Sequence, residues 1–524
     1  MASAFLNKTI RRFMTALAVS LAVADVAAAA PVATIDSGQL TGKIEGGADA
    51  FLGIPFARPP VGSLRWRPPQ PPAAWIGARQ ATSYGPDCMQ IPMSSAPGPG
   101  FANPTSEDCL YVNVWTPSRR PSKTMPVMVW IYGGAFIMGA GSYPDYDGAH
   151  FAEDGIVLVT FNYRVGLFGF FAHPALTREA GGAPVGNYGL MDQIAALKWV
   201  QRNIAAFGGD PKNVTIFGES AGGVFVNTLL ESPAARGLFA KAISESGGGR
   251  TLAGGLGWPA LSSGPGSAES RGAAWARSVG VTGDDVAALR AIPADVLVKA
   301  SVSGKLPSPI IDGKLIPYTI DEAMAHGHRL SVPYMVGANS WEESLLQYLP
   351  NEAHDYVAAM TPATRKEALA LYDDGGNADE DTAAKKLWGE AFMVAPARAL
   401  ARAMAASGAP TYLYHYAYVP VAMRGKVPGA AHSAEINLVF ANEGRVSMFG
   451  EGIADKTIAD LMHGYWVAFA RTGDPNGDGR PKWPRYSATN DTLLDITNDG
   501  AAARKDFEET RLNLLDRIAA PKQP

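Results

Sequence analysis

A single serine stands between glycines directly after a short apolar run, in the segment NVTIFGESAGGVFVNTLL at residues 213–230. The apolar run predicts a buried strand, and the residues after the glycines have the pattern of a helix. A chain that turns sharply from a strand into a helix leaves no room for side chains two residues before and after the turn, where Gly218 and Gly222 stand. Ser is also a favoured N-cap residue, but an N-cap needs no glycine on both sides. The segment therefore predicts a nucleophile elbow with Ser220 at the turn.

Apolar segments alternate with helical patterns along this part of the chain. Runs near 126–132, 155–161, 213–217 and 241–246 predict buried strands. Between the second and third runs, apolar residues fall at helical spacing: Leu190, Ile194, Leu197, Val200 and Ile204. A strand, a helix and a further strand in this order imply a parallel sheet. Further helical patterns between about 265 and 410 are expected to flank the sheet and to wall a pocket. We therefore expect an α/β fold with a large, mostly parallel central sheet.

Length and charge limit the class of protein further. The chain has 524 residues without a linker, repeat or charge run that divides it, which predicts one large unit over 30–524. Hydrophobic residues make up 47% and charged residues 18%, and this composition excludes a disordered polyelectrolyte. The formal charge is −4 and no basic stripe is present, so a nucleic-acid partner is not expected. The oligomeric state does not follow from the sequence.

The first 29 residues have the pattern of a secretory signal peptide. Lys8, Arg11 and Arg12 precede the apolar run at 13–24, and small residues follow before Pro31. The run is short for a membrane span, so we expect no stable membrane anchor after cleavage, which is predicted within residues 27–30. The protein is accordingly expected to be exported, to a periplasm or to the medium.

Two cysteines, Cys88 and Cys109, are the only ones in the chain. An exported protein meets an oxidising compartment, so a disulfide between them is the economical prediction. The histidines form no HExxH motif and no His/Cys pairs at ligand spacing, and no G-x-G-x-x-G opens a βαβ unit. Neither a metal nor a dinucleotide cofactor is expected.

Several motifs together resemble the type-B carboxylesterase (cholinesterase-like) family. The strongest are GLMDQIAALKWVQRNIAAFGGDPKNVTIFGESAGG at 189–223 and EDCLYVNVWTP at 107–117, and similar stretches run almost from end to end of the chain. The resemblance implies an α/β-hydrolase fold, a Ser–Glu–His triad, and hydrolysis of carboxylic esters. A serine hydroxyl needs a base to take its proton, and in this fold the acid and the histidine follow the serine in the chain.

The resemblance places the histidine of the triad on His432 and its acid on Glu342. His432 matches the family's Gly-x-x-His, and Glu342 matches the glutamate of Gly-x-Asn-x-x-Glu-Gly, although Glu343 stands where the family has the second glycine. Asp312, in an Asp-Gly turn, is a weaker rival for the acid. The other histidines after the serine are further candidates, for which a structural role is the first expectation: His326, His328, His354, His415 and His463.

The oxyanion of an ester-hydrolysis intermediate needs backbone N–H donors, which the family alignment places at Gly134, Ala135 and Ala221. Glu219 and Ser246 are candidates for supporting hydrogen bonds only, because a polar turn residue and a strand-end serine explain them equally well.

The predicted function is a serine carboxylic-ester hydrolase that acts through an acyl-enzyme on small, neutral, short-chain alkyl or aryl esters. Alternatives are hydrolysis of an amide, carbamate or lactone by the same triad, or a non-catalytic binding protein of the same family. Choline esters are not expected as substrates, because a quaternary ammonium is bound by aromatic faces and relatives that bind choline carry a key Trp in the first disulfide loop. Here Phe101 is the only aromatic residue between Cys88 and Cys109.

Overall fold

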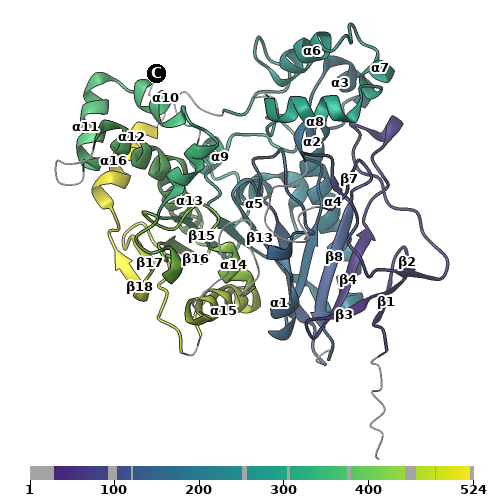
Figure 1. The fold of residues 1–524 in the computed structure, drawn as a ribbon, viewed down its shortest axis with the longest axis horizontal. Helices are drawn as coiled ribbons and strands as arrows, with labels where there is room; N and C mark the ends of the chain where they lie inside the picture. Colours follow the sequence, from purple (N-terminus) through teal and green to yellow (C-terminus); the bar gives the residue numbers. More distant parts are fainter. Residues whose placement is uncertain are drawn as a thin grey trace, which may run out of the picture.

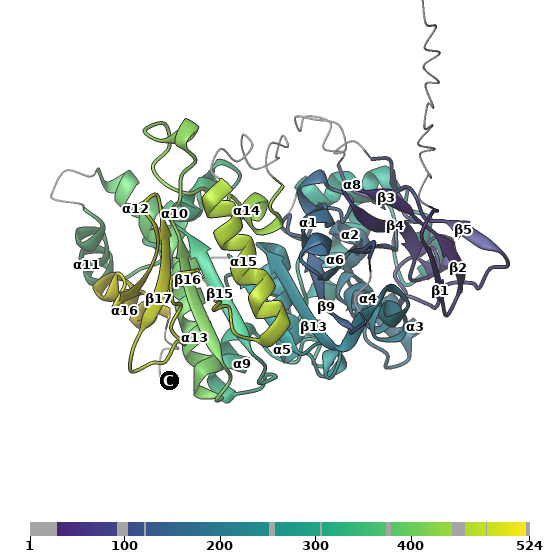
Figure 2. The same ribbon diagram turned by 90° about the horizontal axis from the view of Figure 1, so that it is seen from below.

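A large sheet runs through the molecule from one side to the other (Figures 1 and 2). The computed structural model describes residues 29–91, 103–119, 122–250, 257–303, 307–373, 379–442, 456–477 and 479–519. Within these ranges the sheet has 11 strands. In spatial order they are β18 (Gly500–Lys505), β17 (Thr492–Thr497), β16 (Thr411–Tyr416), β15 (Tyr334–Asn339), β14 (Lys241–Glu245), β13 (Gly209–Glu219), β9 (Met125–Ile131), β10 (Val157–Phe161), β8 (Tyr111–Pro117), β4 (Ala48–Pro55) and β3 (Lys43–Glu45).

The central strands of this sheet are parallel and its two edges are antiparallel. Every neighbouring pair from β10 through β9 and β13 to β17 is parallel. β8, β4 and β3 add antiparallel strands at one edge, and β18 adds one at the other. The four strands predicted from apolar runs are β9, β10, β13 and β14. The prediction of an α/β fold with a mostly parallel sheet is confirmed.

Helices cover both faces of the sheet, which is why its central strands are apolar on both sides. On one face lie α4, α5 and α13, and on the other α1, α14 and α15 (Figure 2). Their bounds are α1 (Ala149–Glu153), α4 (Tyr188–Asn203), α5 (Ala221–Glu231), α13 (Ala395–Ala406), α14 (Ile436–Phe440) and α15 (Lys456–Thr472).

The predicted helix before the serine is α4, and its end has a local cause. After Asn203 the chain tightens into the 3₁₀ turn η3 (Ile204–Phe207), and Gly208 then adopts φ 84°. A left-handed residue ends a helix, and glycine adopts that conformation without a Cβ clash.

The helical patterns between 265 and 410 form helices around the sheet, as expected. The long pattern that ends near 406 is interrupted by a π-helical turn, η6 (Glu390–Val394), between α12 and α13. Pro396 has no amide hydrogen to donate within the helix, which explains a wider turn at this point. The remaining helices are α2 (Gly166–Gly169), α3 (Pro174–Ala180), α6 (Ala268–Ser278), α7 (Val286–Arg290), α8 (Ala294–Ser303), α9 (Ile320–His326), α10 (Glu352–Ala358), α11 (Pro362–Tyr372), α12 (Glu380–Gly389) and α16 (Glu509–Ala519).

Cys88 and Cys109 form the predicted disulfide. Cys88 ends the short strand β6 (Asp87–Cys88), which pairs with β7 (Thr105–Ser106), and Cys109 lies just before β8 of the main sheet. Two further small sheets consist of β1 (Val32–Ile35), β2 (Gly38–Thr41) and β5 (Ala78–Gln80), and of β11 (Phe170–Phe171) and β12 (Gly186–Asn187).

The predicted signal peptide lies outside the described residues, except for residue 29, as does Phe101 of the disulfide loop. In the part of the chain that the structure describes, no helix is both long and apolar enough to cross a bilayer. The assignment of 30–524 to a single domain stays a prediction.

Candidate active site

Ser220 occupies a sharp turn between β13 and α5. Its φ of 56° and ψ of −125° are unfavourable for a residue with a side chain, so the turn is strained. A Cβ at Gly218 would lie 2.5 Å from the carbonyl oxygen of Ile131, and a Cβ at Gly222 would lie 1.9 Å from the same atom. The two glycines are therefore required for the close approach of the elbow to β9, as the sequence predicted.

Three neighbouring parallel strands bring their carboxyl ends together at this turn. Glu219 of β13 is in register with Glu245 of β14, which is in register with Gly337 of β15. The backbone N–H of Ser220 donates to the carbonyl of Glu245 at 2.9 Å. Ser220, Ser246 and Glu342 thus follow the carboxyl ends of three adjacent central strands.

His432 contacts Glu342 directly, although 90 residues separate them in sequence. Nδ1 of His432 lies 2.6 Å from Oε2 of Glu342. The loop that carries the histidine is fixed beside β15, because Trp341 N–H donates to the carbonyl of Ala430 at 2.9 Å and His432 N–H donates to Ser344 Oγ at 3.0 Å.

The carboxylate of Glu342 is buried and held on both oxygens. It is 1% exposed, and its second oxygen, Oε1, accepts hydrogen bonds from Ser246 Oγ at 2.6 Å and from Asn339 N–H at 2.7 Å. A carboxylate bound at Nδ1 favours the tautomer with the proton on Nδ1, which leaves Nε2 free to act as a base.

Nε2 of His432 faces the elbow. It is buried and has no hydrogen-bond partner among the described residues, and it lies at an ion-pair separation of 3.1 Å from Oε1 of Glu219. Glu219 immediately precedes Ser220, and its Oε1 also accepts a hydrogen bond from Ser433 Oγ at 2.5 Å. This nitrogen therefore lies beside the residue that directly precedes the predicted nucleophile.

Buried carboxylates control the charge of this histidine. Burial alone lowers the pKa of His432, but the carboxylates of Glu219 and Glu342 outweigh it and raise the pKa to about 9. Burial raises the pKa of Glu219 to about 7 and that of Glu435 to about 8, and it raises the pKa of Glu245 well above its usual range. Protonation of the histidine is thus favoured by its carboxylate neighbours.

Removal of the Glu219 charge is expected to shift the pH dependence of catalysis by His432. In Glu219→Gln the imidazolium loses a stabilising carboxylate, so the pKa of His432 falls and the neutral base persists to lower pH. The acid limb of the pH profile of kcat/KM should move down by about one pH unit or more. In the control variant Glu435→Gln the shift should be smaller, because Glu435 has the weakest of these effects on the histidine. An acid limb that stays in place or moves up in Glu219→Gln would contradict this account.

The loop after β9 lies against the elbow. A Cβ at Gly133 would be 3.0 Å from Cβ of Ser220. Ala135 and Phe136 have φ of 52° and 66°, and the carbonyl of Phe136 accepts a hydrogen bond from Gly166 N–H at 2.7 Å. Ala221 opens α5, where the first N–H groups have no partner within the helix. Gly134 and Ala135 thus directly follow the residue that approaches Ser220, Ala221 directly follows Ser220 itself, and the role of all three as oxyanion donors stays a prediction.

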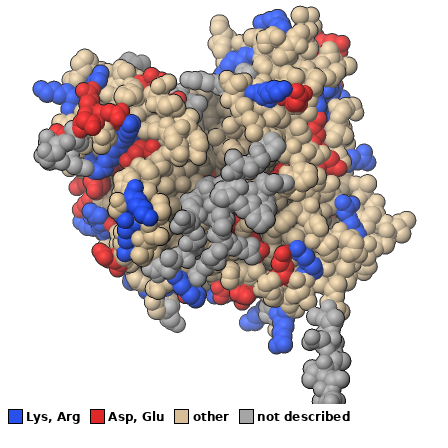
Figure 3. Space-filling view, in the orientation of Figure 1, with Lys and Arg blue, Asp and Glu red and all other residues tan. Residues whose placement is uncertain are grey.

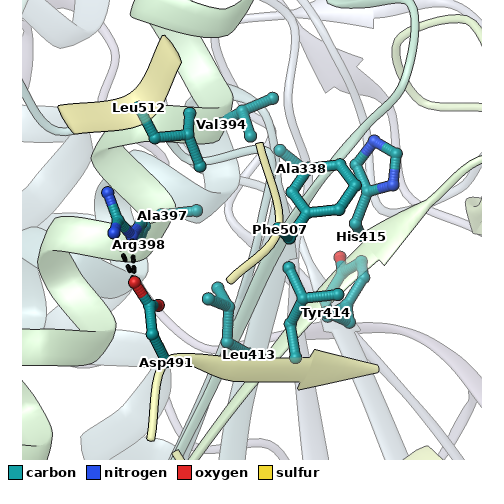
Figure 4. Close-up of a pocket in the computed structure, with 11 residues that line it drawn as sticks. Ala338, Val394, Ala397, Arg398, Leu413, Tyr414, His415, Asp491, Phe507 and Leu512 are labelled. Atoms are coloured by element: carbon teal, nitrogen blue, oxygen red, sulfur yellow. Dashed lines mark hydrogen bonds and ion pairs between the residues drawn. The ribbon is translucent and has the colours of Figure 1, made fainter. Parts of the chain in front are cut away.

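The other candidate histidines have structural partners. Nδ1 of His415 lies 2.9 Å from Asp495, and the imidazole lines a small cavity of mostly apolar side chains next to the Arg398–Asp491 pair (Figure 4). His463 bridges the carbonyl of Val439 and the carboxylate of Asp154, at 2.7 and 3.1 Å.

The remaining three histidines lie at the surface. His328 stacks on Tyr318, His326 lies tilted against His328, and His354 pairs with Asp381. None of the five alternatives contacts Glu342 in the described part of the chain. Asp312, the rival acid, accepts hydrogen bonds from the backbone N–H groups of Lys314, Leu315 and Ile316, so it stabilises its own turn.

Two residues that contribute to the site were not predicted as part of it from the sequence. Ser246 donates to Glu342, and Glu219 contacts both Ser433 and His432. The available signal was their position at the ends of predicted neighbouring strands. Among the described residues, no cluster of three or more His, Cys, Asp and Glu side chains is arranged to hold a metal ion.

A strained serine between a parallel strand and a helix, beside a buried histidine–glutamate pair, is the arrangement of a serine hydrolase with the α/β-hydrolase fold. The family comparison makes the assignment specific: the model of the carboxylesterase family matches residues 29–515, and the chain belongs to that family.

Characterised relatives cover nearly the whole chain. Fumonisin B1 esterase of Sphingopyxis macrogoltabida is 40% identical over 86% of this chain and 83% of its own length. Para-nitrobenzyl esterase of Bacillus subtilis (strain 168) is 36% identical over 88% and 94%, and liver carboxylesterase of Sus scrofa is 34% identical over 98% of both chains. A solved structure of PNB esterase matches with a TM-score of 0.79, at 33% identity, over 94% of this chain and 99% of that one. The protein is therefore an ester hydrolase of the serine hydrolase class.

Proposed function

We propose that this esterase hydrolyses small, neutral alkyl and aryl esters through an acyl-enzyme on Ser220. The observation that carries the proposal is the contact between His432 and Glu342, with Nε2 of the histidine beside Glu219 of the elbow and without a hydrogen bond among the described residues. The named relatives act on different esters. This difference supports the view that members of the family recognise the ester group and not one particular alcohol.

The proposed reaction has two halves with one histidine serving both. His432 takes the proton of Ser220 as Oγ attacks the ester carbonyl carbon, and N–H groups of Gly134, Ala135 and Ala221 stabilise the oxyanion. The imidazolium then protonates the alcohol oxygen as its bond to the carbonyl carbon breaks. The alcohol is released, and the acyl group stays bonded to Ser220. In the second half His432 takes a proton from water, the hydroxide attacks the acyl carbon, and Ser220 leaves with the proton as the acid is released.

Neutral substrates are proposed because of the composition of the disulfide loop and of the surface. The loop between Cys88 and Cys109 is rich in Pro, Gly and Met and contains no Trp. Flexible Met side chains suit apolar groups of varied shape. Figure 3 shows basic and acidic side chains interspersed among the described residues of this face, and these residues form no field of one sign that would attract an ionic substrate.

The substrate class is tested by a matched set of esters. The loop contains no Trp, the side chain that binds a quaternary ammonium best, and such contacts contribute about 0.5–2 kcal/mol each. Aryl and short alkyl acetates should therefore have a kcat/KM at least about tenfold above that of acetylcholine. The corresponding acetamide serves as the matched control for the acyl bond. A preference for acetylcholine would overturn the neutral-substrate proposal, and faster cleavage of the amide than of the ester would favour the amidase alternative.

We propose further that the protein is exported and that residues 1–29 are removed. The disulfide supports this proposal, because such bonds persist in oxidising compartments and are rare in the cytosol. Expression of the full chain, followed by N-terminal sequencing of periplasmic and medium fractions, tests it. A protein recovered in the cytosol with its first residues intact would contradict the proposal.

A further inference from the structure

The side chain of Gln90 forms two hydrogen bonds with a single residue of the loop beside the nucleophile. Its Nε2 donates to the carbonyl of Gly139 at 2.8 Å, and the N–H of Gly139 donates to its Oε1 at 2.8 Å. Gln90 is 5% exposed, so these bonds form away from water. The amide thus pairs with Gly139 as a neighbouring strand would.

Gly139 closes the loop that follows β9. With φ of 116°, it lies so close to the start of the loop that a Cβ would be 2.3 Å from Tyr132 and 2.6 Å from the carbonyl of Gly133. Within the loop, the carbonyl of Gly134 accepts hydrogen bonds from Ile137 N–H at 3.0 Å and Met138 N–H at 3.1 Å. A constraint on Gly139 therefore acts on a short, internally bonded ring that contains Gly134 and Ala135.

Gln90 is itself fixed by the disulfide. It lies two residues after Cys88, and its Nε2 also donates to the carbonyl of Cys88 at 3.1 Å. Cys88 is bonded to Cys109, which lies two residues before the start of β8 of the main sheet. Asp87, which precedes Cys88, accepts a hydrogen bond from Ser142 Oγ at 2.7 Å. Ser142 lies three residues after Gly139 in the chain. The sheet, the disulfide, Gln90 and the loop therefore form one connected series of contacts.

We propose that Gln90 is a positioning residue for the oxyanion: it holds the loop so that the N–H groups of Gly134 and Ala135 point to the carbonyl oxygen of the substrate. This proposal rests on the proposed function, in which those groups are the donors. Gln90 does not touch the substrate and acts through Gly139. A donor that shifts by a fraction of an ångström stabilises the transition state less but leaves ground-state binding almost unchanged.

Two variants of Gln90 alter the contact in different ways. Gln90→Met keeps the length of the side chain and removes both hydrogen bonds. Gln90→Glu keeps an acceptor for Gly139 N–H but places a carboxylate oxygen against the carbonyl of Gly139. Gln201→Met is the matched control, because the amide of Gln201 also bonds two backbone carbonyls, those of Pro211 and Leu238, outside the loop and the elbow.

The readout is the inhibition constant of an aryl trifluoromethyl ketone, compared with KM of the corresponding ester. Ser220 Oγ adds to the ketone carbon, its proton passes to His432, and the ketone oxygen becomes an alkoxide that needs the donors. Concentrations of active protein are set by titration with a fluorophosphonate. We expect both Gln90 variants to lower kcat and to weaken the ketone about tenfold or more, with KM within about threefold of wild type and Gln201→Met unchanged.

A purely structural role would give a different result. If the Gln90 variants unfold at lower temperature but keep wild-type kcat and ketone affinity per titrated site, the proposal is wrong. If Gln90→Met or Gln90→Glu does not fold, Gln90→Asn, whose side chain is shorter by one methylene, allows the same comparison of ketone affinity with KM. Unchanged ketone affinity in Gln90→Asn would also contradict the proposal. Wild-type protein that turns over esters without fluorophosphonate label on Ser220 would instead refute the proposed function.

Discussion

Ser220→Ala is expected to lower kcat for an aryl acetate by about 10⁴-fold or more, because alanine has no hydroxyl to attack the carbonyl and no acyl-enzyme can form. Residual rate above the uncatalysed reaction should remain, since the oxyanion donors and the binding site are still present. The fold should persist: the strained turn depends on Gly218 and Gly222, and the serine hydroxyl is not needed for the backbone hydrogen bond between Ser220 and Glu245.

The matched control for this experiment lies at the other end of the same helix. Ser232 caps α5 at its C-terminus and is 1% exposed, so Ser232→Ala also removes a hydroxyl from a serine flanking α5. Its kcat should stay close to that of wild type. Circular dichroism and thermal unfolding of both variants establish that any lost rate is not lost structure. A Ser220→Ala variant with a substantial fraction of wild-type kcat would exclude this serine as the nucleophile.

Glu342→Gln is expected to lower kcat by about 10³- to 10⁴-fold, the effect seen when a triad carboxylate becomes an amide. The amide can present its NH₂ group to Nδ1 of His432, which favours the tautomer with the proton on Nε2, and that tautomer cannot accept the proton of Ser220. The amide also carries no charge to stabilise the imidazolium. Steady-state kinetics over a range of pH measures the loss, and it should persist at every pH at which the protein is folded.

The adjacent Glu343 provides the control. It is half-buried against α12, where a Cβ at Gly389 would lie 2.8 Å from its Oε2, and burial raises its pKa to about 7. No contact between Glu343 and His432 is present in the described part of the chain. Glu343→Gln should therefore change kcat by less than about tenfold. A larger loss of kcat in Glu343→Gln than in Glu342→Gln would show that Glu343, and not Glu342, is the acid that pairs with His432.

The elbow and the sheet could be predicted from the sequence because both depend on local patterns. Apolar runs and glycine spacing predicted β9, β10, β13 and β14 and the turn at Ser220. The resemblance to the family proposed Glu342 and His432 as partners, and the two side chains are in contact. The adjacent Glu343 left the choice of acid open to question, and the structure separates the two: only Glu342 reaches the histidine, because Asn339 and Ser246 hold its other oxygen.

Contacts between distant segments could not be predicted in this way. Gln90 and Gly139 are 49 residues apart, and Ser433 and Glu219 are 214 apart, so no local periodicity connects them. Their contacts depend on the order of strands in the sheet and on the path of the loops between them. The π-helical turn at 390–394 could not be predicted for a different reason. A single proline within a strong helical pattern indicates that the helix is interrupted but not whether the interruption is a kink, a break or a π-helical turn.

The central claim is that Ser220 attacks the ester and carries the acyl group. Its most direct test is to treat the folded wild-type protein with a fluorophosphonate, digest it, and map the label by mass spectrometry alongside the residual esterase activity. The account predicts one phosphonyl group per chain on the peptide that contains Ser220, with activity lost in proportion to labelling, and no label in Ser220→Ala. Complete inactivation with the label on another residue, or full activity with Ser220 labelled, would contradict it.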